Sequence, residues 1–108
     1  MQFVVIGKDK GQGELRLKAR AAHLDYVAGR QALILYAGPL IEGGRMIGSV
    51  FIFDVADRAQ LDACLAADPY FADGGIFETV EIYESRKMVP EAEPGFLAAE
   101  AERARAAQ

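Results

Sequence analysis

Hydrophobic and polar positions along the chain form two kinds of pattern, short apolar runs and longer segments of helix-forming residues. The apolar runs are rich in β-branched and aromatic residues, which predicts strands at Gln2–Lys8, Ala32–Glu42, Met46–Ala56 and Gly75–Ser85. The longer segments predict two helices, at Glu14–Gly29 and Asp57–Asp68. This order, βαββαβ, predicts an α+β ferredoxin-like fold with an antiparallel sheet.

Turn and capping residues mark the ends of several elements. The glycines in "EGGR" (Glu42–Arg45) favour the positive φ angles of a tight hairpin turn. Asp57 is suited to cap the second helix, because Gln60 follows at the capping-box spacing. Pro69 disfavours α-conformation in the residue before it, so the second helix should end at Asp68.

The predicted sheet has apolar residues on both faces. In the third strand, one face carries Ile47, Ser49, Phe51, Phe53 and Val55, and the other carries Gly48, Val50, Ile52 and Asp54. In the first strand, Val4 and Ile6 lie on one side and Phe3 and Val5 on the other. Because the two helices cover only one face, we expect a homodimer packed sheet against sheet, with a higher oligomer also compatible. The alternative is that the C-terminal segment folds back over the sheet.

The composition changes after Val89. "PEAEPGF" contains two prolines, and "FLAAEAERARAAQ" is rich in alanine, with Glu–Arg pairs three residues apart. We expect residues 1–89 to form the domain and residues 90–108 to form a linker and a C-terminal helix. This helix would be anchored through Phe96 and Leu97, either on the domain or on a partner subunit.

Composition argues against several classes of function. The chain has 108 residues, of which 52% are hydrophobic, and a net charge of -4 without a basic stripe, which fits one globular domain and no nucleic-acid partner. Cys64 is the only cysteine and His23 the only histidine, so neither an internal disulfide nor a metal site is expected. No stretch approaches the ~20 apolar residues of a membrane span, and the N-terminal run is too short for a signal peptide. We therefore expect a soluble cytoplasmic protein without a membrane partner.

Asp68 is a candidate for chemistry, because it continues the helical line of Leu61, Cys64 and Leu65. A carboxylate is unfavourable both at the negative end of a helix dipole and in apolar surroundings without a partner. One explanation is that Asp68 points to water and caps the turn in "DPYF". The other is that a cationic or hydrogen-bonding group holds it, and His23 on the neighbouring helix is suited to that role. Such a pair would orient the imidazole for general acid–base catalysis.

Other residues have a functional and a structural explanation each. His23 lies at the edge of an apolar stripe of Leu17, Leu24 and Val27, so its structural explanation is a histidine at the surface or at the rim of the core. Arg20, one turn before His23, could hold an anionic group or face solvent. The remaining candidates are Gly38 and Gly48, which leave room for a ligand or mark a bulge; Ser49, a hydroxyl among apolar neighbours; and Tyr70 and Phe71, which wall a pocket or belong to the core.

Four segments together resemble the YciI-like family: "RAAHLDYV", "AGPL", "IGS" and "AADPYFADGGIFETVEI", in that order within residues 1–89. The resemblance implies a ferredoxin-like domain that dimerises as an α/β barrel, with an active site at His23 and Asp68. It also implies that Ser49 and the backbone around Gly38 and Pro39 line the pocket. Most members have no established reaction, but a branch that breaks down chlorinated aromatics acts as a cofactor-free dehydrochlorinase with the His/Asp pair. The tail from position 90 departs from the shortest members.

Two functions fit these observations. The first is a cofactor-independent lyase or isomerase acting on a small cyclic or aromatic molecule: His23 removes a proton, Asp68 stabilises the imidazolium, and Arg20 or Ser49 positions an oxygen. This function predicts a buried contact between His23 and Asp68 facing a pocket. The second is a non-catalytic dimeric module that binds a small metabolite or serves in assembly. The apolar sheet favours a dimer in both cases.

Overall fold

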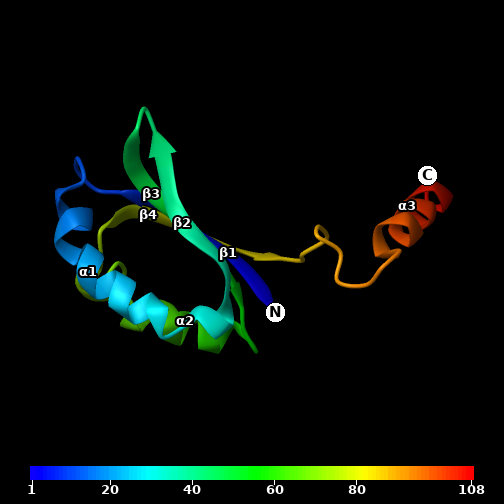
Figure 1. Ribbon diagram of the computed structural model, residues 1–108, viewed down its shortest axis with the longest axis horizontal. Helices are drawn as coiled ribbons and strands as arrows, with labels where there is room; N and C mark the ends of the chain where they lie inside the picture. Colours follow the sequence, from blue (N-terminus) through cyan, green and yellow to red (C-terminus); the bar gives the residue numbers. More distant parts are fainter.

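The computed structural model describes all residues from 1 to 108 and contains one four-stranded sheet (Figure 1). The elements are, in chain order, β1 (Gln2–Asp9), α1 (Glu14–Ala28), β2 (Ile34–Glu42), β3 (Arg45–Asp54), α2 (Arg58–Ala67), β4 (Phe77–Ser85) and α3 (Phe96–Ala106). The strands lie in the order β2-β3-β1-β4, and every neighbouring pair is antiparallel. The α+β fold with βαββαβ order that the sequence predicts is therefore confirmed.

Local signals determine both ends of α2. At its start, the Asp57 carboxylate accepts the backbone N–H of Gln60 at 2.9 Å, and the Gln60 side chain accepts the N–H of Ala56 at 2.7 Å. At its end, Asp68 has extended backbone angles because Pro69 follows it. The Asp68 side chain therefore lies in the turn that follows α2 and not on the surface of the helix.

The β2–β3 hairpin turns at Gly43 and Gly44, whose φ angles of 58° and 80° are those that a two-residue turn requires. The structure differs from the prediction at the start of β2, which begins at Ile34. The preceding residues, Gln31–Leu33, form a 3₁₀ turn that leads out of α1.

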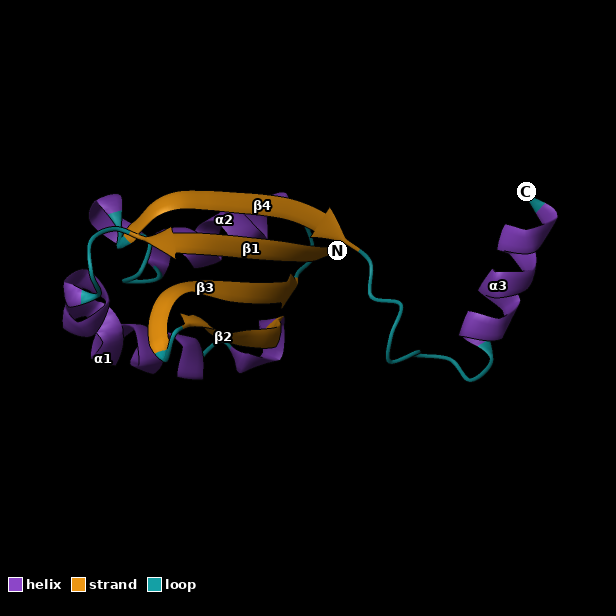
Figure 2. Cartoon of the chain, turned by 90° about the horizontal axis from the view of Figure 1, so that it is seen from above, coloured by secondary structure: helices purple, strands orange, loops and turns teal.

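Both α1 and α2 lie on the same face of the sheet (Figures 1 and 2). The core between them is built mainly from aromatic and aliphatic side chains of the central strands and of α2, including Val5, Phe51 and Leu61. Because Val5 pairs with Phe51 and Phe3 with Phe53, alternate residues of β1 and β3 face the helices.

The helix α1 turns a polar side toward the sheet. The apolar stripe of Leu17, Leu24 and Val27 is not the buried face, since Leu17 is 77% and Leu24 46% exposed, while Val27 is half-buried. The buried residues of α1 are Arg16 and His23. Leu15 and Ala19 pack against the core beside them, so the inward side of α1 combines apolar contacts with the polar contacts of Arg16 and His23.

The other face of the sheet is not covered. Val4 pairs with Ile52 and Ile6 with Val50, and all four side chains are only half-buried. The helix α3 stands apart from the sheet, beyond the end of β4 (Figure 2). The alternative in which the C-terminal segment folds back over the sheet is therefore wrong. The expectation that Phe96 and Leu97 anchor this helix on the domain is wrong as well.

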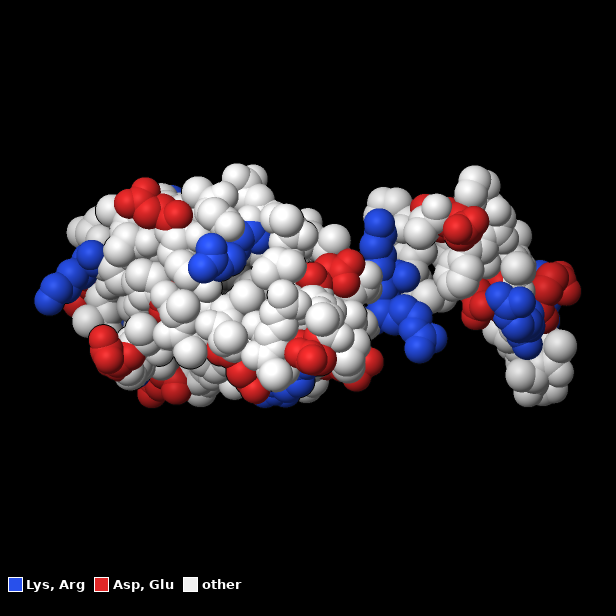
Figure 3. Space-filling model, turned by 90° about the horizontal axis from the view of Figure 1, so that it is seen from below, with Lys and Arg blue, Asp and Glu red and all other residues white.

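Charges of both signs are interspersed on the face drawn in Figure 3, without a continuous basic stripe. The same view shows α3 joined to the domain by a narrow connection. None of the three α-helices combines the length and apolar character needed to cross a membrane.

Candidate active site

His23 and Asp68 meet where the two helices that cover the sheet come together. His23 lies on α1, Asp68 ends α2, and His23 Nδ1 lies 2.8 Å from Asp68 Oδ1. Both residues are buried, and Asp68 is only 2% exposed. The contact expected from the sequence is therefore present, and the alternative in which Asp68 points to water is wrong.

Asp68 also caps the turn that follows it. Its Oδ1 accepts the backbone N–H of Tyr70 at 2.9 Å, and its carbonyl accepts the N–H groups of Phe71 and Ala72. The sequence offered two alternative roles for Asp68, a turn cap and a partner of the imidazole. In the structure the same oxygen has both roles. The turn itself places the carboxylate where it meets His23.

The contact determines how the imidazole is used. A carboxylate only accepts hydrogen bonds, so His23 Nδ1 carries a proton in this pair, and in the neutral imidazole the lone pair is then on Nε2. A carboxylate on one ring nitrogen and a lone pair on the other is the arrangement of an oriented general base.

Tyr70 packs against the imidazole. The His23 and Tyr70 rings are stacked with centres 3.6 Å apart and planes within 4°, and Phe51 meets the imidazole edge-on at 6.0 Å. Tyr70 is fully buried, yet its hydroxyl has no hydrogen-bond partner within the protein. Buried hydroxyls without a partner are uncommon because they cost free energy, so this group is an unsatisfied donor beside the imidazole.

Arg16 forms a buried ion pair next to these rings. Its Nε and Nη2 donate to the two Asp9 carboxylate oxygens at 2.7 and 2.8 Å, and Nη2 also donates to Ser49 Oγ at 2.9 Å. Burial alone would lower the pKa of Arg16, but the hydrogen bonds and charge of Asp9, together with Tyr70, raise that pKa above its usual value. The Arg16 guanidinium lies 5.0 Å from the centre of the Tyr70 ring, so a permanent positive charge borders the site.

Arg16 and Asp9 are site residues that the sequence argument missed. A signal for Arg16 was available, since Arg16, Arg20 and His23 recur at i, i+4 and i+7 and so share one face of α1. Asp9 carried no comparable signal, because its position at the end of a strand is equally typical of a solvent-exposed loop residue.

A cavity of about 160 Å³ adjoins His23. The residues expected at a site that do line it are Arg20, His23, Gly38, Pro39, Ser49 and Tyr70. Asp68 is connected to the cavity through its contact with His23. Phe71 is not part of the lining; its ring packs in the core, 5.7 Å from the ring centre of Phe51 and 5.1 Å from that of Phe77.

The two glycines singled out near the hairpin have different roles. Gly38 lines the cavity, whereas Gly48 is required by strand packing, since a Cβ there would lie 2.3 Å from the carbonyl oxygen of Gly7. The structural explanation therefore holds for Gly48.

The residues that line the cavity include His23, Ser49 and Tyr70 together with Arg16 and Arg20, so an imidazole, two hydroxyl-bearing side chains and two guanidinium-bearing side chains meet there. Together they can remove a proton and stabilise an oxygen atom that gains negative charge. No three His, Cys, Asp or Glu side chains in the structure are grouped closely enough to hold a metal ion.

Comparisons with known proteins agree with this architecture. The chain is similar to the solved structure of 5-chloro-2-hydroxyhydroquinone dehydrochlorinase from Burkholderia phenoliruptrix AC1100, in complex with 2,5-dihydroxybenzoquinone. The TM-score is 0.75 at 23% sequence identity, over 84% of this chain and 99% of that one, which shows a shared fold. A search of curated proteins found no match. The model of the YCII-related domain matches residues 1–86, and the chain therefore belongs to the YCII-related domain family.

Proposed function

We propose that this protein is a small enzyme of the lyase or isomerase type, in which His23 is the general base and Asp68 orients it. The observation that supports this function most directly is the buried contact between His23 Nδ1 and Asp68 Oδ1 beside a cavity that His23 lines. A binding module would have little need of a buried carboxylate–imidazole pair at a residue that lines a cavity.

In this mechanism His23 Nε2 takes a proton from a hydroxyl or carbon of the substrate. The electron pair left behind moves into the substrate, toward an oxygen or toward the bond to a leaving group such as chloride. Asp68 stabilises the imidazolium that forms, while the hydroxyls of Ser49 and Tyr70 and the charge of Arg16 stabilise the substrate oxygen. Return of the proton to a different atom completes an isomerisation, and departure of chloride completes an elimination. These steps use side chains of this chain alone.

The proposed substrate is a small cyclic or aromatic compound with at least one hydroxyl or carbonyl oxygen. A cavity of about 150 Å³ is enough to hold benzene, and the cavity beside His23 measures about 160 Å³. The similar solved structure is named as a dehydrochlorinase and holds 2,5-dihydroxybenzoquinone, which supports trying chlorinated hydroxyquinols first.

The test combines turnover with the protonation of the imidazole. Chloride release from 5-chloro-2-hydroxyhydroquinone and tautomerisation of non-chlorinated hydroxyquinones would be measured for the wild type, His23→Gln and Asp68→Asn. We expect His23→Gln to reduce the rate by about 10²–10⁴-fold, the usual contribution of a general base. Because His23 is the only histidine, ¹⁵N NMR of its ring reports the tautomer without overlap, and the wild type should carry its proton on Nδ1, next to Asp68.

Two results would contradict the proposal. If His23→Gln turns over these substrates at the wild-type rate, His23 is not the general base. A folded wild type that turns over none of them but binds them would instead favour the non-catalytic small-molecule-binding module.

We also propose a homodimer formed through the open face of the sheet. Val4, Ile6, Val50 and Ile52 form the middle of this face and are half-buried without any covering element. Apolar faces of this kind are normally covered in solution, and a two-fold contact between sheets covers both copies at once.

A further inference from the structure

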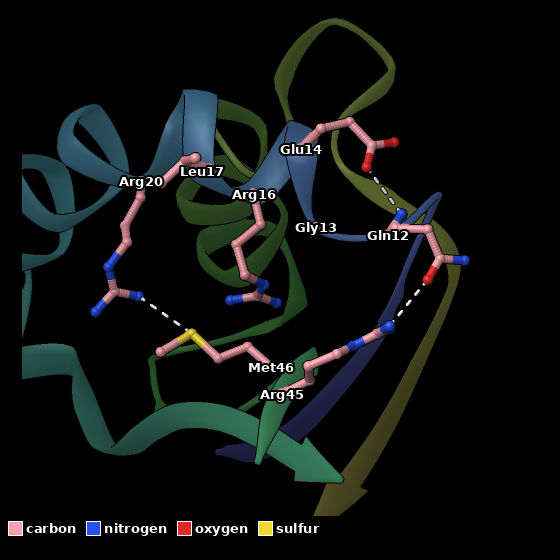
Figure 4. Close-up of a pocket in the computed structure, with 8 residues that line it drawn as sticks. All are labelled: Gln12, Gly13, Glu14, Arg16, Leu17, Arg20, Arg45 and Met46. Atoms are coloured by element: carbon pink, nitrogen blue, oxygen red, sulfur yellow. Dashed lines mark hydrogen bonds between the residues drawn. The ribbon is translucent and has the colours of Figure 1, made fainter. Parts of the chain in front are cut away.

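A second and larger cavity opens next to the one at His23. It measures about 570 Å³ and lies between the start of α1 and the start of β3 (Figure 4). Arg16 and Arg20 line both cavities, so the two are neighbours. Figure 4 shows the guanidinium groups of Arg16 and Arg20 extending from α1 toward β3, with Arg45 and Met46 on the opposite wall.

Two of the three arginines at this cavity have no carboxylate partner. Arg16 is neutralised by Asp9. The contact of Arg20 is with the Met46 sulfur, 3.6 Å from its Nη1, and Arg45 Nη1 donates to the neutral Gln12 side chain at 2.9 Å. Elsewhere in the chain, Arg58, Arg103 and Arg105 each pair with an acid three or four residues away, whereas Arg30 lies over the Tyr26 ring, outside this cavity.

Glu14 is the one acidic residue in the lining. Its carboxylate accepts the backbone N–H of Gln12 at 2.9 Å, and in Figure 4 it turns away from Arg20. Backbone hydrogen bonds from its own residue and from Gln12 lower the pKa of Glu14, so it stays ionised. The cavity therefore has two positive charges that lack an acid against one negative charge, in a chain whose net charge is -4.

We propose that this cavity is the subsite for a carboxylate group of the substrate, held by Arg20 and Arg45. The inference rests on the proposed function, because it assigns the ring of the same molecule to the cavity at His23. A guanidinium presents two parallel N–H groups that match the two oxygens of a carboxylate. The thioether of Met46 and the amide oxygen of Gln12 each accept only one of these N–H groups. A substrate that fills both cavities would then carry a carboxylate in addition to the hydroxyl or carbonyl oxygen at His23, and such ring carboxylic acids are the substrates to test beside the hydroxyquinones.

The spacing along α1 fits such a molecule. Arg20 precedes His23 by three residues, so the two side chains start about 5–6 Å apart on the same face of the helix. A carboxylate on Arg20 would thus leave the attached ring within reach of His23. Arg45, on β3, lies on the opposite wall, where its side chain extends toward Gln12, and it would contribute positive charge to the cavity.

The experiment measures binding of benzoate to the full-length protein by ¹H–¹⁵N NMR titration, with benzamide as the neutral probe of equal size. We expect benzoate to bind more tightly than benzamide, and Arg20→Gln and Arg45→Gln each to weaken benzoate by about tenfold, with benzamide unchanged. Arg58→Gln is the matched control, because it removes the same charge from an exposed helix position and should leave both affinities unchanged.

The proposal is overturned if the wild type does not prefer benzoate over benzamide, or if the double variant Arg20→Gln/Arg45→Gln keeps the preference. Tighter binding of inorganic phosphate than of benzoate would overturn the assignment to a carboxylate. The same titrations on His23→Gln separate this inference from the catalytic one. A retained preference for benzoate supports the subsite whether or not His23 proves to be the base.

Discussion

A single oxygen of Asp68 connects the fold to the candidate chemistry. It receives both the Tyr70 amide and the His23 ring, so the turn after α2 and the orientation of the imidazole depend on the same atom. An asparagine at this position keeps an acceptor for the turn but no charge for an imidazolium. Asp68→Asn therefore tests the electrostatic role while it leaves the local backbone in place.

The buried pair of Arg16 and Asp9 predicts a large effect on stability. Their side chains are only 5% and 6% exposed. Replacing Arg16 by methionine leaves the Asp9 carboxylate buried without its cation, and we expect the free energy of unfolding in urea to fall by about 3–5 kcal/mol. The exposed pair of Arg58 and Asp62 is the control, since Arg58→Met should cost less than about 1 kcal/mol. Equal losses in the two variants would contradict the burial argument.

Removing the hydroxyl of Tyr70 should leave stability unchanged or higher and should lower the turnover of the substrate. Because this hydroxyl has no partner in the protein, Tyr70→Phe removes an unsatisfied buried group and keeps the ring stacked on His23. We expect the free energy of unfolding to stay the same or to rise by about 1 kcal/mol. Turnover of the substrate should nevertheless fall by about tenfold or more, because a donor to its oxygen is lost. A clear loss of stability would show instead that the hydroxyl has a structural role.

At the scale of elements, α1 explains both a success and a failure of prediction. Its existence and bounds followed from helix-forming residues and from Gly29 at its end. Its orientation did not follow, because the usual rule places apolar side chains inward and here Leu17 and Leu24 point outward. The inward face carries Arg16 and His23, whose cost of burial is offset by Asp9 and Asp68 on other elements.

The start of α3 predicts a dependence on pH. The Glu91 carboxylate accepts the N–H groups of Leu97 and Gly95 at 2.9 and 3.1 Å, and these bonds lower its pKa. A group whose pKa is lower in the folded state stabilises that state above its unfolded pKa, and this contribution is lost as the pH falls through the folded value. We therefore expect the first turn of α3 to lose its helical ¹³Cα shifts as the pH is lowered below the usual range of a glutamate.

Glu91→Ala is the comparison for this titration. It should show the weakened first turn already at neutral pH, since the cap is absent, while the amides of β1 stay unchanged in both proteins. Identical pH profiles for α3 in the wild type and the variant would mean that Glu91 does not cap the helix.

At the scale of the whole molecule, the open sheet face predicts assembly. We expect the full-length chain to elute as a dimer in size-exclusion chromatography with light scattering, and Ile52→Glu to weaken dimerisation by about 100-fold, because it places a charge in an apolar contact. Leu17→Glu is the control, as Leu17 is a large exposed apolar residue on α1.

A variant truncated after Val89 tests whether the open sheet face or α3 forms the dimer contact. If the sheet carries the dimer, removing residues 90–108 leaves it intact, because α3 stands apart from that face. A wild-type monomer, or a dimer that is lost only with α3, would contradict assembly through the sheet.

The sequence by itself determined the elements, their order and the antiparallel ferredoxin-like topology. These follow from side-chain periodicity, caps and turn glycines, which act over a few residues and are therefore legible in a linear chain. It also identified His23 and Asp68 as residues in need of an explanation. Only the tertiary structure showed that these two residues, which are 45 positions apart in the sequence, are in contact. It also showed that Tyr70 stacks on the imidazole and that Arg16 donates hydrogen bonds to Asp9 and Ser49. Such contacts depend on how each helix is rotated against the sheet, and where the buried face is polar, that rotation is determined by partners on other elements.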